Sequence, residues 1–494
     1  MSARPHVLLI TADHWPASLL GIAGHPVIQT PTLDQLARCG RRFPRAYSEC
    51  PVCIPARRTL LTGTSPRVHG DRTFQVTLPM PDHLPTLPGL FRDAGYQAYA
   101  VGKVHVFPQR ARVGFNDVIL AEEGRPHWGV LDDYDIFLGD RGYAGRQFDH
   151  GMSNNEYSTR TWHLPDDTHV TNWTAQQMCR MIRRRDPTMP GFWYLSFTHP
   201  HPPLVPLEYY WNFYQQLDPP LPETGEWAQD ESLLPYRLRL QRAGWHCSTE
   251  IEIRTALRAF YALCTQIDHQ IRLVIGTLRE EGLLDNTIIL FTADHGDMLG
   301  THGMWAKRLY YEGSAAVPMI LVGTKGDERV GTQQVDHRPV GWQDILPTLL
   351  DLAGIEVPES VTGQSMVSAE PRATLYGECN EGETATRMLH EGRYKLIYYA
   401  AGNVLQLFDL EDDPTELLDL STSADHTDVR NRLVAALKAE LYGSDLTWLK
   451  EGELVGLPEP DFLPEPARDL SIQRGTHWPL PPVVPPEEKS TKIQ

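Results

Sequence analysis

The chain is poor in cysteine, in positive charge and in long apolar runs, and each shortage excludes a class of protein. Its seven cysteines are odd in number and loosely spaced over 494 residues, which argues against a disulfide framework. The formal net charge of −18 argues against a non-specific nucleic-acid binder, which would present a basic face. No apolar stretch approaches the roughly 20 residues that a membrane-spanning helix needs.

The first residues also lack the pattern of a secretion signal. Met1–His6 leads directly into Val7–Ile10, an apolar run that is too short for a signal peptide and indicates a first strand. From this run and the scattered cysteines we expect a cytoplasmic protein that contacts neither a membrane nor nucleic acid.

What the chain does have is a regular alternation of short apolar runs and helical patterns through its first two-thirds. Strands are predicted at His6–Thr11, Tyr96–Val101, Phe192–Phe197, Thr287–Thr292 and Val317–Val322, and helices at Thr32–Gly40, Leu87–Gly95 and Ile251–Arg279. This alternation predicts an α/β fold with a large, mostly parallel sheet flanked by helices on both faces. Functional residues are then expected just beyond the strand ends.

The pattern changes after about residue 368. Short strands are predicted at Thr374–Glu378, Tyr394–Tyr399 and Leu405–Leu410, and a helix at Asp425–Leu441. From Glu451 onward the chain is rich in proline, which excludes helices and central strands. We therefore predict a catalytic domain over residues 1–368, a smaller α+β subdomain over 369–450 and an extended arm over 451–494.

The most informative short pattern is Cys53-Ile54-Pro55-Ala56-Arg57, which is followed by Arg58-Thr59-Leu60-Leu61-Thr62-Gly63. Cys50 and Cys53 also form a C-x-x-C, which is typical of a redox pair or of half a zinc site. No second C-x-x-C exists to complete a zinc knuckle. The longer run resembles the signature of type I, formylglycine-dependent sulfatases of the alkaline phosphatase superfamily, which includes the related phosphonate monoester hydrolases. The resemblance implies an alkaline-phosphatase-like fold and a maturation enzyme that oxidises Cys53 to formylglycine, the nucleophile.

Two further segments resemble the metal-binding part of that family. Asp13 ends the first predicted strand, and Asp294-His295-Gly296-Asp297 follows a later one and resembles the family's D-H-G-E. The chain departs from the family at Asp297 and at His14, where aspartate or glutamine is usual. The resemblance implies that Asp13, Asp294, His295 and residue 53 hold one divalent ion, with His14 as an additional candidate. Oxygen ligands favour Ca²⁺ or Mg²⁺, and a histidine ligand makes Mn²⁺ an alternative. Read in isolation, Asp13 could also be a helix N-cap.

Three more segments resemble the family pattern in the expected order. Lys103-Val104-His105 resembles G-K-x-H, and alternation along an extended chain would place both side chains on one side. Pro200-His201-Pro202-Pro203 resembles P-H-x-P, which favours His201 over His199. Lys307 ends a segment that resembles G-x-H-G-x-W-x-K. The resemblance implies catalytic roles for Cys53, Arg57, Lys103, His105, His201 and Lys307, and substrate binding by Lys103, His201, His302 and Lys307.

These residues together predict hydrolysis of a small anionic sulfate ester. Fixed positive charge from Arg57, Lys103, Lys307 and the metal would surround the sulfuryl oxygens in the transition state. His201 or Lys307 would protonate the departing oxygen, and His105 would take a proton from the second formylglycine hydroxyl. The alternatives are a phosphonate monoester or phosphodiester hydrolase of the same family, and a non-catalytic anion-binding relative in which Cys53 stays a thiol. The long arm of the related phosphonate hydrolases also implies a homo-oligomer, a dimer or tetramer.

Overall fold

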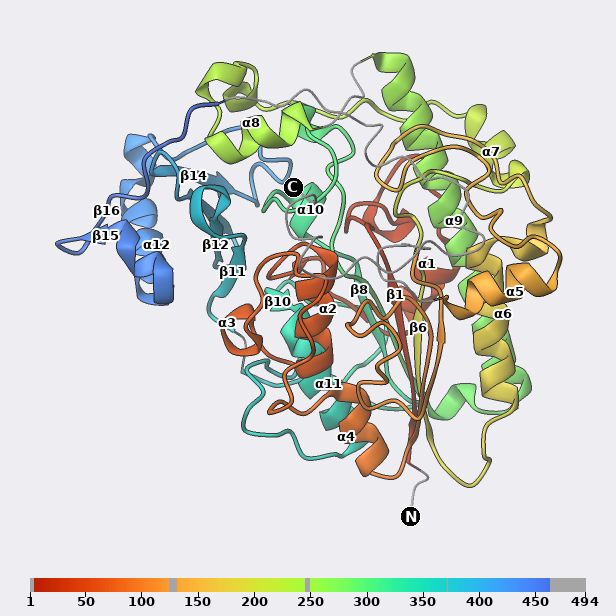
Figure 1. The fold of residues 1–494 in the computed structure, drawn as a ribbon. Helices are drawn as coiled ribbons and strands as arrows, with labels where there is room; N and C mark the ends of the chain where they lie inside the picture. Colours follow the sequence, from red (N-terminus) through yellow and green to blue (C-terminus); the bar gives the residue numbers. More distant parts are fainter. Residues whose placement is uncertain (1–3, 124–130, 245–248, 371, 463–494) are drawn as a thin grey trace.

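The computed structural model describes residues 4–123, 131–244, 249–370 and 372–462. Its centre is an eight-stranded sheet in the order β5-β4-β6-β1-β7-β8-β2-β9 (Figure 1). The first five of these strands run parallel. The strands span β1 His6–Ala12, β2 Arg41–Arg42, β4 Gln97–Gly102, β5 Asp117–Leu120, β6 Gly191–Ser196, β7 Thr287–Ala293, β8 Met319–Val322 and β9 Gln334–Val335. The expected α/β architecture is confirmed.

One predicted strand runs against the parallel direction. β8 pairs antiparallel with both β7 and β2, a direction that the predicted, mostly parallel sheet did not specify for its apolar run. A parallel neighbour requires a crossover to the opposite end of the sheet. The chain between β7 and β8 instead holds one short α-helix, α10 (Glu312–Ala315), and a 3-10 turn at Thr301–Gly303, so it re-enters the sheet from the end at which β7 stops.

Helices cover both faces of the central sheet (Figure 1). On one side α9 (Glu250–Glu280) packs against α6 (Val170–Arg183), α7 (Glu208–Gln215) and α1 (Pro31–Cys39). On the other side α2 (Cys53–Thr62) packs against α4 (Leu87–Asp93) and α11 (Ile345–Ala353). The remaining helices are α3 Pro66–His69, α5 Asp133–Asp140, α8 Tyr236–Ala243 and α12 Thr427–Glu440. The central strands β6 and β7 are buried on both faces, as the apolar run of β7 predicts.

A second sheet lies to the side of the first and carries α12 (Figure 1). It is antiparallel in the order β11-β12-β13-β14, with β11 at Leu375–Cys379, β12 at Thr386–His390, β13 at Tyr394–Tyr399 and β14 at Val404–Asp409. The sequence analysis missed β12, because Arg387 and His390 interrupt its apolar residues. Two small sheets complete the fold: β3 Ala46–Tyr47 with β10 Val340–Gly341, and β15 Leu449–Lys450 with β16 Glu453–Leu454.

The second sheet is attached to the main body through a buried ion pair. Lys395 of β13 lies 2.6 Å from Glu312 of α10 and 2.7 Å from Glu416, and its side chain is fully buried. The boundaries near residues 368 and 450 stay predictions, as does the docking of the arm, whose anchors Leu463, Ile472 and Trp478 lie outside the described residues. Within the described ranges, none of the helices is both long enough and apolar enough to cross a membrane.

Candidate active site

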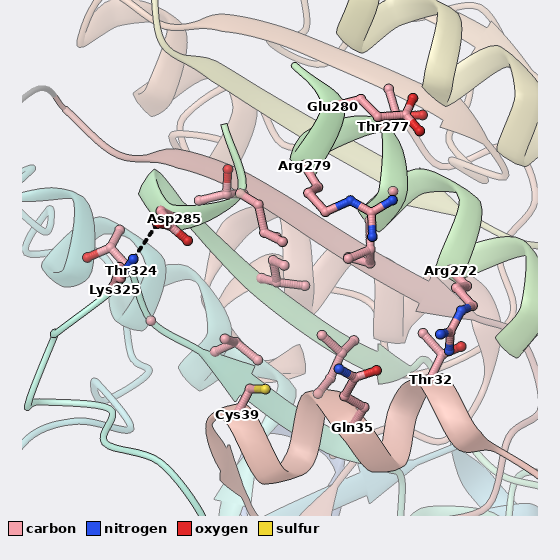
Figure 2. A pocket seen from close by; sticks show the side chains of 18 of the residues that line it. Thr32, Gln35, Cys39, Arg272, Thr277, Arg279, Glu280, Asp285, Thr324 and Lys325 are labelled. Carbon is pink, nitrogen blue, oxygen red and sulfur yellow. Dashed lines mark hydrogen bonds and ion pairs between the residues drawn. The ribbon is translucent and has the colours of Figure 1, made fainter. Parts of the chain in front are cut away.

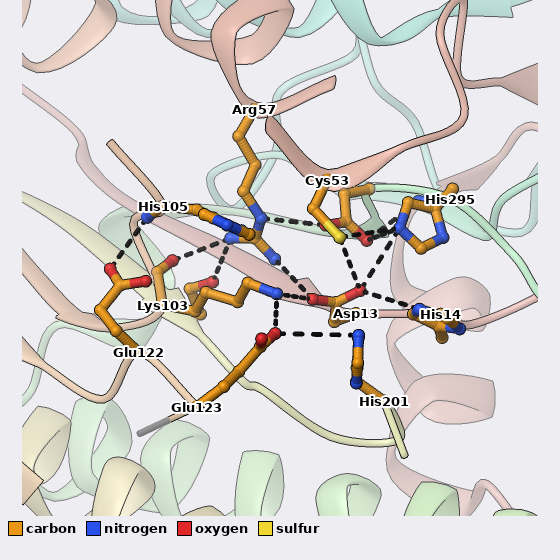
Figure 3. Close-up of polar contacts among 12 residues, drawn as sticks. Asp13, His14, Cys53, Arg57, Lys103, His105, Glu122, Glu123, His201 and His295 are labelled. Atoms are coloured by element: carbon orange, nitrogen blue, oxygen red, sulfur yellow. Dashed lines mark hydrogen bonds and ion pairs between the residues drawn. The ribbon is translucent and has the colours of Figure 1, made fainter. Parts of the chain in front are cut away.

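Neighbouring strands of the central sheet end at the residues that the sequence singles out (Figure 3). Asp13 follows β1, Asp294 follows β7 and Lys103 follows β4. His201 lies beyond the end of β6. Because β4, β6, β1 and β7 are adjacent and parallel, their carboxyl ends lie along one edge of the sheet, where open α/β sheets place their sites.

Cys53 is the first residue of α2, so its side chain lies at the amino terminus of that helix. The buried sulfur lies 3.3 Å from Nε2 of His295, 3.0 Å from Nζ of Lys307 and 3.8 Å from Oδ1 of Asp13. Burial and Asp13 oppose ionisation of the Cys53 thiol, but Lys103, Lys307 and His295 outweigh them and lower its pKa. Residue 53 therefore lies between candidate metal ligands and fixed cations.

Asp13, Cys53, Asp294 and His295 form a buried group whose ligand atoms all lie within 4.8 Å of one another. Nδ1 of His295 lies 2.9 Å from the Gly296 carbonyl oxygen, to which it donates, so the lone pair of Nε2 faces the group. Two buried carboxylates need positive charge beside them, and two carboxylates with one imidazole suit a divalent cation. The residues present thus fit the implied metal. His14 is not part of this group as the described residues define it.

Arg57 directs its guanidinium into the protein and toward a candidate metal ligand. Nε lies 2.9 Å from Oδ2 of Asp294, and Nη1 donates to the Lys103 carbonyl and to Ser196 Oγ, both at 2.8 Å. Burial alone would lower the pKa of Arg57, but the Asp294 carboxylate more than offsets it and the pKa is raised. Arg57 is thus a permanently charged group that holds Asp294 in place.

Lys103 is fully buried, and its ammonium contacts the carboxylates of Asp13 and Glu123. Burial opposes its charge, yet Asp13 and the neighbouring anions raise the pKa of Lys103. The sequence analysis did not name Glu123. Its signal was available, because Glu122 and Glu123 follow β5 at the same edge of the sheet.

His105 lies near the site, but the predicted alternation along an extended strand does not place it there. β4 ends at Gly102, and His105 adopts a left-handed backbone conformation with φ of 62°, so the chain is no longer extended there. Oε1 of Glu122 accepts hydrogen bonds from the backbone N–H groups of Val104 at 2.8 Å and His105 at 2.9 Å. Glu122, another residue that the sequence analysis missed, therefore fixes this turn.

The two candidate histidines after β6 have different surroundings. Nε2 of His201 lies 4.0 Å from Oε1 of Glu123, and its ring contacts the ring of His14 with 4.3 Å between centroids. His199 points instead toward Thr171, whose Oγ1 lies 3.0 Å from its Nδ1. These contacts support the preference for His201. Burial lowers the pKa of His201 to about 3, so its imidazole is neutral near pH 7.

Lys307 contacts Cys53, a member of the candidate metal group. Among the described residues, no interaction joins His302 to that group. His302 is buried against Trp227, with 4.8 Å between ring centroids, and its Nδ1 accepts a hydrogen bond from the Gly225 N–H at 3.1 Å. Its ring also contacts Tyr311. These are packing contacts, and they give no support to the predicted substrate-binding role of His302.

His14 lies beside the metal group, with Nε2 3.8 Å from Oδ1 of Asp13, but its two shortest contacts are with residues outside that group. Its Nδ1 lies 2.8 Å from Oδ2 of Asp297, and Nζ of Lys307 lies 2.6 Å from its Nε2. Burial, followed by Lys307 and His201, lowers the pKa of His14, so the ring is neutral. Burial raises the pKa of Asp297 to about 6, and Asp297 is therefore ionised above that pH.

A separate groove of about 1260 Å³ opens beside the amino end of β7 (Figure 2). It lies among α1, α6 and α9, with Gln35, Arg272 and Arg279 along its walls. None of the candidate catalytic or metal residues lines it. Those residues follow the opposite, carboxyl end of the same strand, so the groove is not part of the candidate active site.

Comparisons with known proteins agree with the geometry of the site. A family model described as Sulfatase matches residues 5–355, and one described as N-sulphoglucosamine sulphohydrolase, C-terminal, matches residues 300–442. The chain is 34% identical over 471 residues to an arylsulfatase of Clostridium perfringens (strain 13 / Type A), covering 90% of this chain and 95% of the relative. It is 30% identical over 441 residues to a choline-sulfatase of Rhizobium meliloti (strain 1021), covering 85% of this chain and 83% of the relative.

Solved structures with the same fold include phosphonate monoester hydrolases. The enzyme of Agrobacterium radiobacter superposes with a TM-score of 0.77 at 24% identity, covering 92% of this chain and all (100%) of that chain. The enzyme of Silicibacter pomeroyi gives a TM-score of 0.73 at 24% identity, covering 90% and 97%. At these identities the likeness establishes the fold alone.

Proposed function

This chain belongs to the sulfatase family of the alkaline phosphatase superfamily and is a sulfuric ester hydrolase, and we propose that it works with a formylglycine made from Cys53 and one divalent metal ion. The observation that carries this proposal is the position of the Cys53 sulfur, 3.3 Å from Nε2 of His295 and 3.0 Å from Nζ of Lys307. A hydrated aldehyde at this place supplies two hydroxyls on one carbon, one to attack sulfur and one to expel sulfate. A maturation enzyme that oxidises Cys53 is therefore an implied partner.

Asp13, Asp294 and His295 would hold the metal together with residue 53. A divalent cation there lowers the pKa of a coordinated hydroxyl and stabilises negative charge on the sulfuryl oxygens. Ca²⁺ is our preferred ion because two of the three side chains are carboxylates. Mn²⁺ and Mg²⁺ are the alternatives, and the imidazole favours Mn²⁺ of the two.

The remaining residues divide into groups that face the substrate and groups that hold those in place. Lys103 and Lys307 supply fixed positive charge, while Arg57 orients Asp294. Lys307 protonates the departing oxygen, because the single proton of the neutral His201 imidazole is on Nδ1, which donates to the Pro202 carbonyl oxygen at 2.6 Å. His201 is kept as a residue that contacts the substrate. His105 takes the proton from the second hydroxyl when sulfate departs.

The proposed substrate is a small sulfate ester with an aryl or cationic alkyl alcohol. This choice rests on the relatives that are named for arylsulfatase and choline-sulfatase activity. A second candidate, hydrolysis of phosphonate monoesters or phosphodiesters, is favoured by the fold neighbours. Lys103 and His105 favour a sulfate ester over a phosphorus ester as the substrate, since the related phosphonate hydrolases tend to carry hydroxyl residues at these positions.

Two further parts of the proposal concern the protein in the cell. None of the six described cysteines forms a disulfide, which is typical of a reducing compartment and supports a cytoplasmic location. The proline-rich arm supports a homo-oligomer, a dimer or tetramer.

Mass spectrometry of the peptide that carries residue 53 tests the nucleophile directly. Conversion of cysteine to formylglycine lowers its mass by about 18 Da, a modification that changes the chemistry of the side chain. Rates on aryl, choline and sugar sulfates, compared with a phosphonate monoester and a phosphodiester, test the substrate. An unmodified thiol in fully active protein, or faster turnover of the phosphorus esters, would overturn the respective part of the proposal.

A further inference from the structure

The two positions at which this chain departs from the family pattern contact each other. His14 replaces a carboxylate or carboxamide, Asp297 replaces a glutamate, and Nδ1 of His14 lies 2.8 Å from Oδ2 of Asp297. Both side chains are buried. The departures therefore form one structural unit that the pattern of either segment alone does not reveal.

Asp297 is held by four donors, which fixes the direction of each hydrogen bond. Its Oδ1 accepts from the backbone N–H groups of Leu299 and Ala306, both at 3.0 Å. Its Oδ2 accepts from the Tyr157 hydroxyl and from Nδ1 of His14. Since an ionised carboxylate only accepts, the proton of the His14 ring is on Nδ1 and the lone pair is on Nε2.

That lone pair faces the ammonium of Lys307. Nζ of Lys307 lies 2.6 Å from Nε2 of His14 and 3.0 Å from the Cys53 sulfur. A lysine has a long, flexible stem, so an ammonium needs a fixed acceptor to remain in one place. His14 supplies that acceptor through Nε2.

We propose that Asp297 and His14 are positioning residues that hold the Lys307 ammonium against residue 53 and the departing oxygen of the ester. This inference rests on the proposed role of Lys307 as the proton donor. Asp297 acts twice, because it orients the His14 ring and also binds the backbone of Ala306, the residue before Lys307. Lys307 is thereby held through its side chain and through the residue that precedes it.

The first experiment compares substrates whose leaving groups differ in basicity. An alkyl sulfate needs protonation of the departing oxygen far more than 4-nitrophenyl sulfate does. His14→Phe removes the acceptor and should lower kcat about 100-fold on the alkyl ester and about tenfold or less on the nitrophenyl ester, within the range for residues that orient catalytic groups. A merely structural role would lower both rates by the same factor.

Two variants separate the hydrogen-bond pattern from packing. His14→Gln keeps one donor and one acceptor on a single carbon and should recover most of the rate on the alkyl sulfate. Asp297→Asn can donate to Nδ1 of His14 and so places the ring proton on Nε2, against Lys307, which should cost as much as His14→Phe. Equal rates for Asp297→Asn and the wild type would overturn the inference. These two variants also test it if His14→Phe does not fold.

A double-mutant cycle with Lys307→Ala decides whether His14 acts through Lys307. We expect His14→Phe to add less than a threefold loss when Lys307 is already absent, and additive losses would overturn the inference. A wild-type rate for Lys307→Ala alone would instead overturn the proposed role of Lys307. Elemental analysis gives a readout that is independent of rate: His14→Phe should keep the wild-type metal content, and loss of the metal would make His14 a ligand. His426→Gln, in the distant C-terminal subdomain, is the matched control.

Discussion

Nε of Arg57 lies 2.9 Å from Oδ2 of Asp294, and Nη1 of the same guanidinium donates to the Lys103 carbonyl. Arg57 therefore holds a candidate metal ligand and the turn that carries Lys103. The sequence-based expectation that Arg57 adds charge around the sulfuryl oxygens stays a prediction. The two contacts predict which property of the enzyme a change at Arg57 will affect first.

Arg57→Lys should lower metal content and reduce kcat by about tenfold to 100-fold, the range for residues that orient a metal ligand. One ammonium cannot reproduce the fork of donors that joins Asp294 to the Lys103 turn. Elemental analysis and kcat measured on the same preparation check this. Arg58→Lys is the matched control, because Arg58 donates to the carbonyls of Leu78 and Pro79. Full metal occupancy with a wild-type rate would contradict the assigned role of Arg57.

Cys53→Ser should keep the fold and lose multiple turnover. A serine at the start of α2 can be sulfated once, but it lacks the second hydroxyl that expels sulfate from a formylglycine. Intact mass should show at most one sulfate retained per chain after incubation with substrate. Sustained turnover by this variant would rule out the formylglycine mechanism.

Lys103→Ala should reduce kcat on the order of 10²–10³-fold, the scale for removing one preorganised electrostatic contact. Lys103 lies fully buried between Asp13 and Glu123, so its removal also leaves two carboxylates without their shared cation. Steady-state kinetics check the rate, and a thermal melt at matched pH separates it from unfolding. If Lys103→Ala retained the wild-type rate, its charge would be unnecessary for catalysis.

The sequence predicts which residues form the site better than it predicts the contacts among them. Asp13, Lys103 and Asp294 follow apolar runs that must be strands, and parallel neighbours bring such ends together. The direction in which Arg57 points is a property of tertiary packing, which no local pattern encodes. Asp297 and His14 are 283 residues apart in the chain, so their contact is visible only after folding.

The same distinction applies to the fold. Strands with uniform apolar runs, such as β1 and β7, are recognisable because both of their faces are buried. β12 is buried too, but it carries Arg387, whose charge is neutralised by Asp445 of the 3-10 helix Gly443–Trp448, 2.8 Å away. The antiparallel direction of β8 depends on the length and course of the preceding loop, which a strand pattern does not contain.

Glu122→Gln should change the pH dependence of stability. Burial raises the pKa of Glu122 to about 7, above its value in the unfolded chain. The folded state therefore favours the protonated carboxyl. The contribution of Glu122 to stability is fully present below about pH 4.5 and is lost as the pH rises through 7, by on the order of 3 kcal/mol in total.

Glutamine is a close replacement because Oε1 alone accepts from Val104 and His105. The variant should gain stability relative to the wild type at pH 8 and lose that gain at pH 4.5. Urea midpoints at both pH values check this prediction. Glu123→Gln is a comparison variant, since its carboxylate is paired with Lys103 and its change should destabilise the protein at pH 8. An identical pH profile for Glu122→Gln and wild type would contradict the burial argument.

Removal of residues 463–494 should lower the oligomeric state. Residues just before this segment contact the body of the same chain: the Leu457 N–H donates to the Ala400 carbonyl at 2.8 Å, and the guanidinium of Arg239 lies 5.1 Å from the centre of the Phe462 ring. A truncation after Phe462 keeps these contacts, so any change in oligomeric state is due to the loss of residues 463–494. Their spaced apolar anchors and many prolines cannot build a core alone and bury area only against another surface.

Light scattering should give a dimer or tetramer for the full chain and a smaller species for the chain that ends at Phe462. A truncation after Pro486 removes only the mostly polar residues 487–494 and is the control that should keep the full-length oligomeric state. A thermal melt of each protein separates dissociation from unfolding. If the full chain is a monomer, or if the Phe462 truncation keeps the full-length oligomeric mass, the arm does not hold subunits together. A truncated monomer with the wild-type kcat would show that each subunit carries a complete site, because Asp13, Cys53, Asp294 and His295 come from one chain.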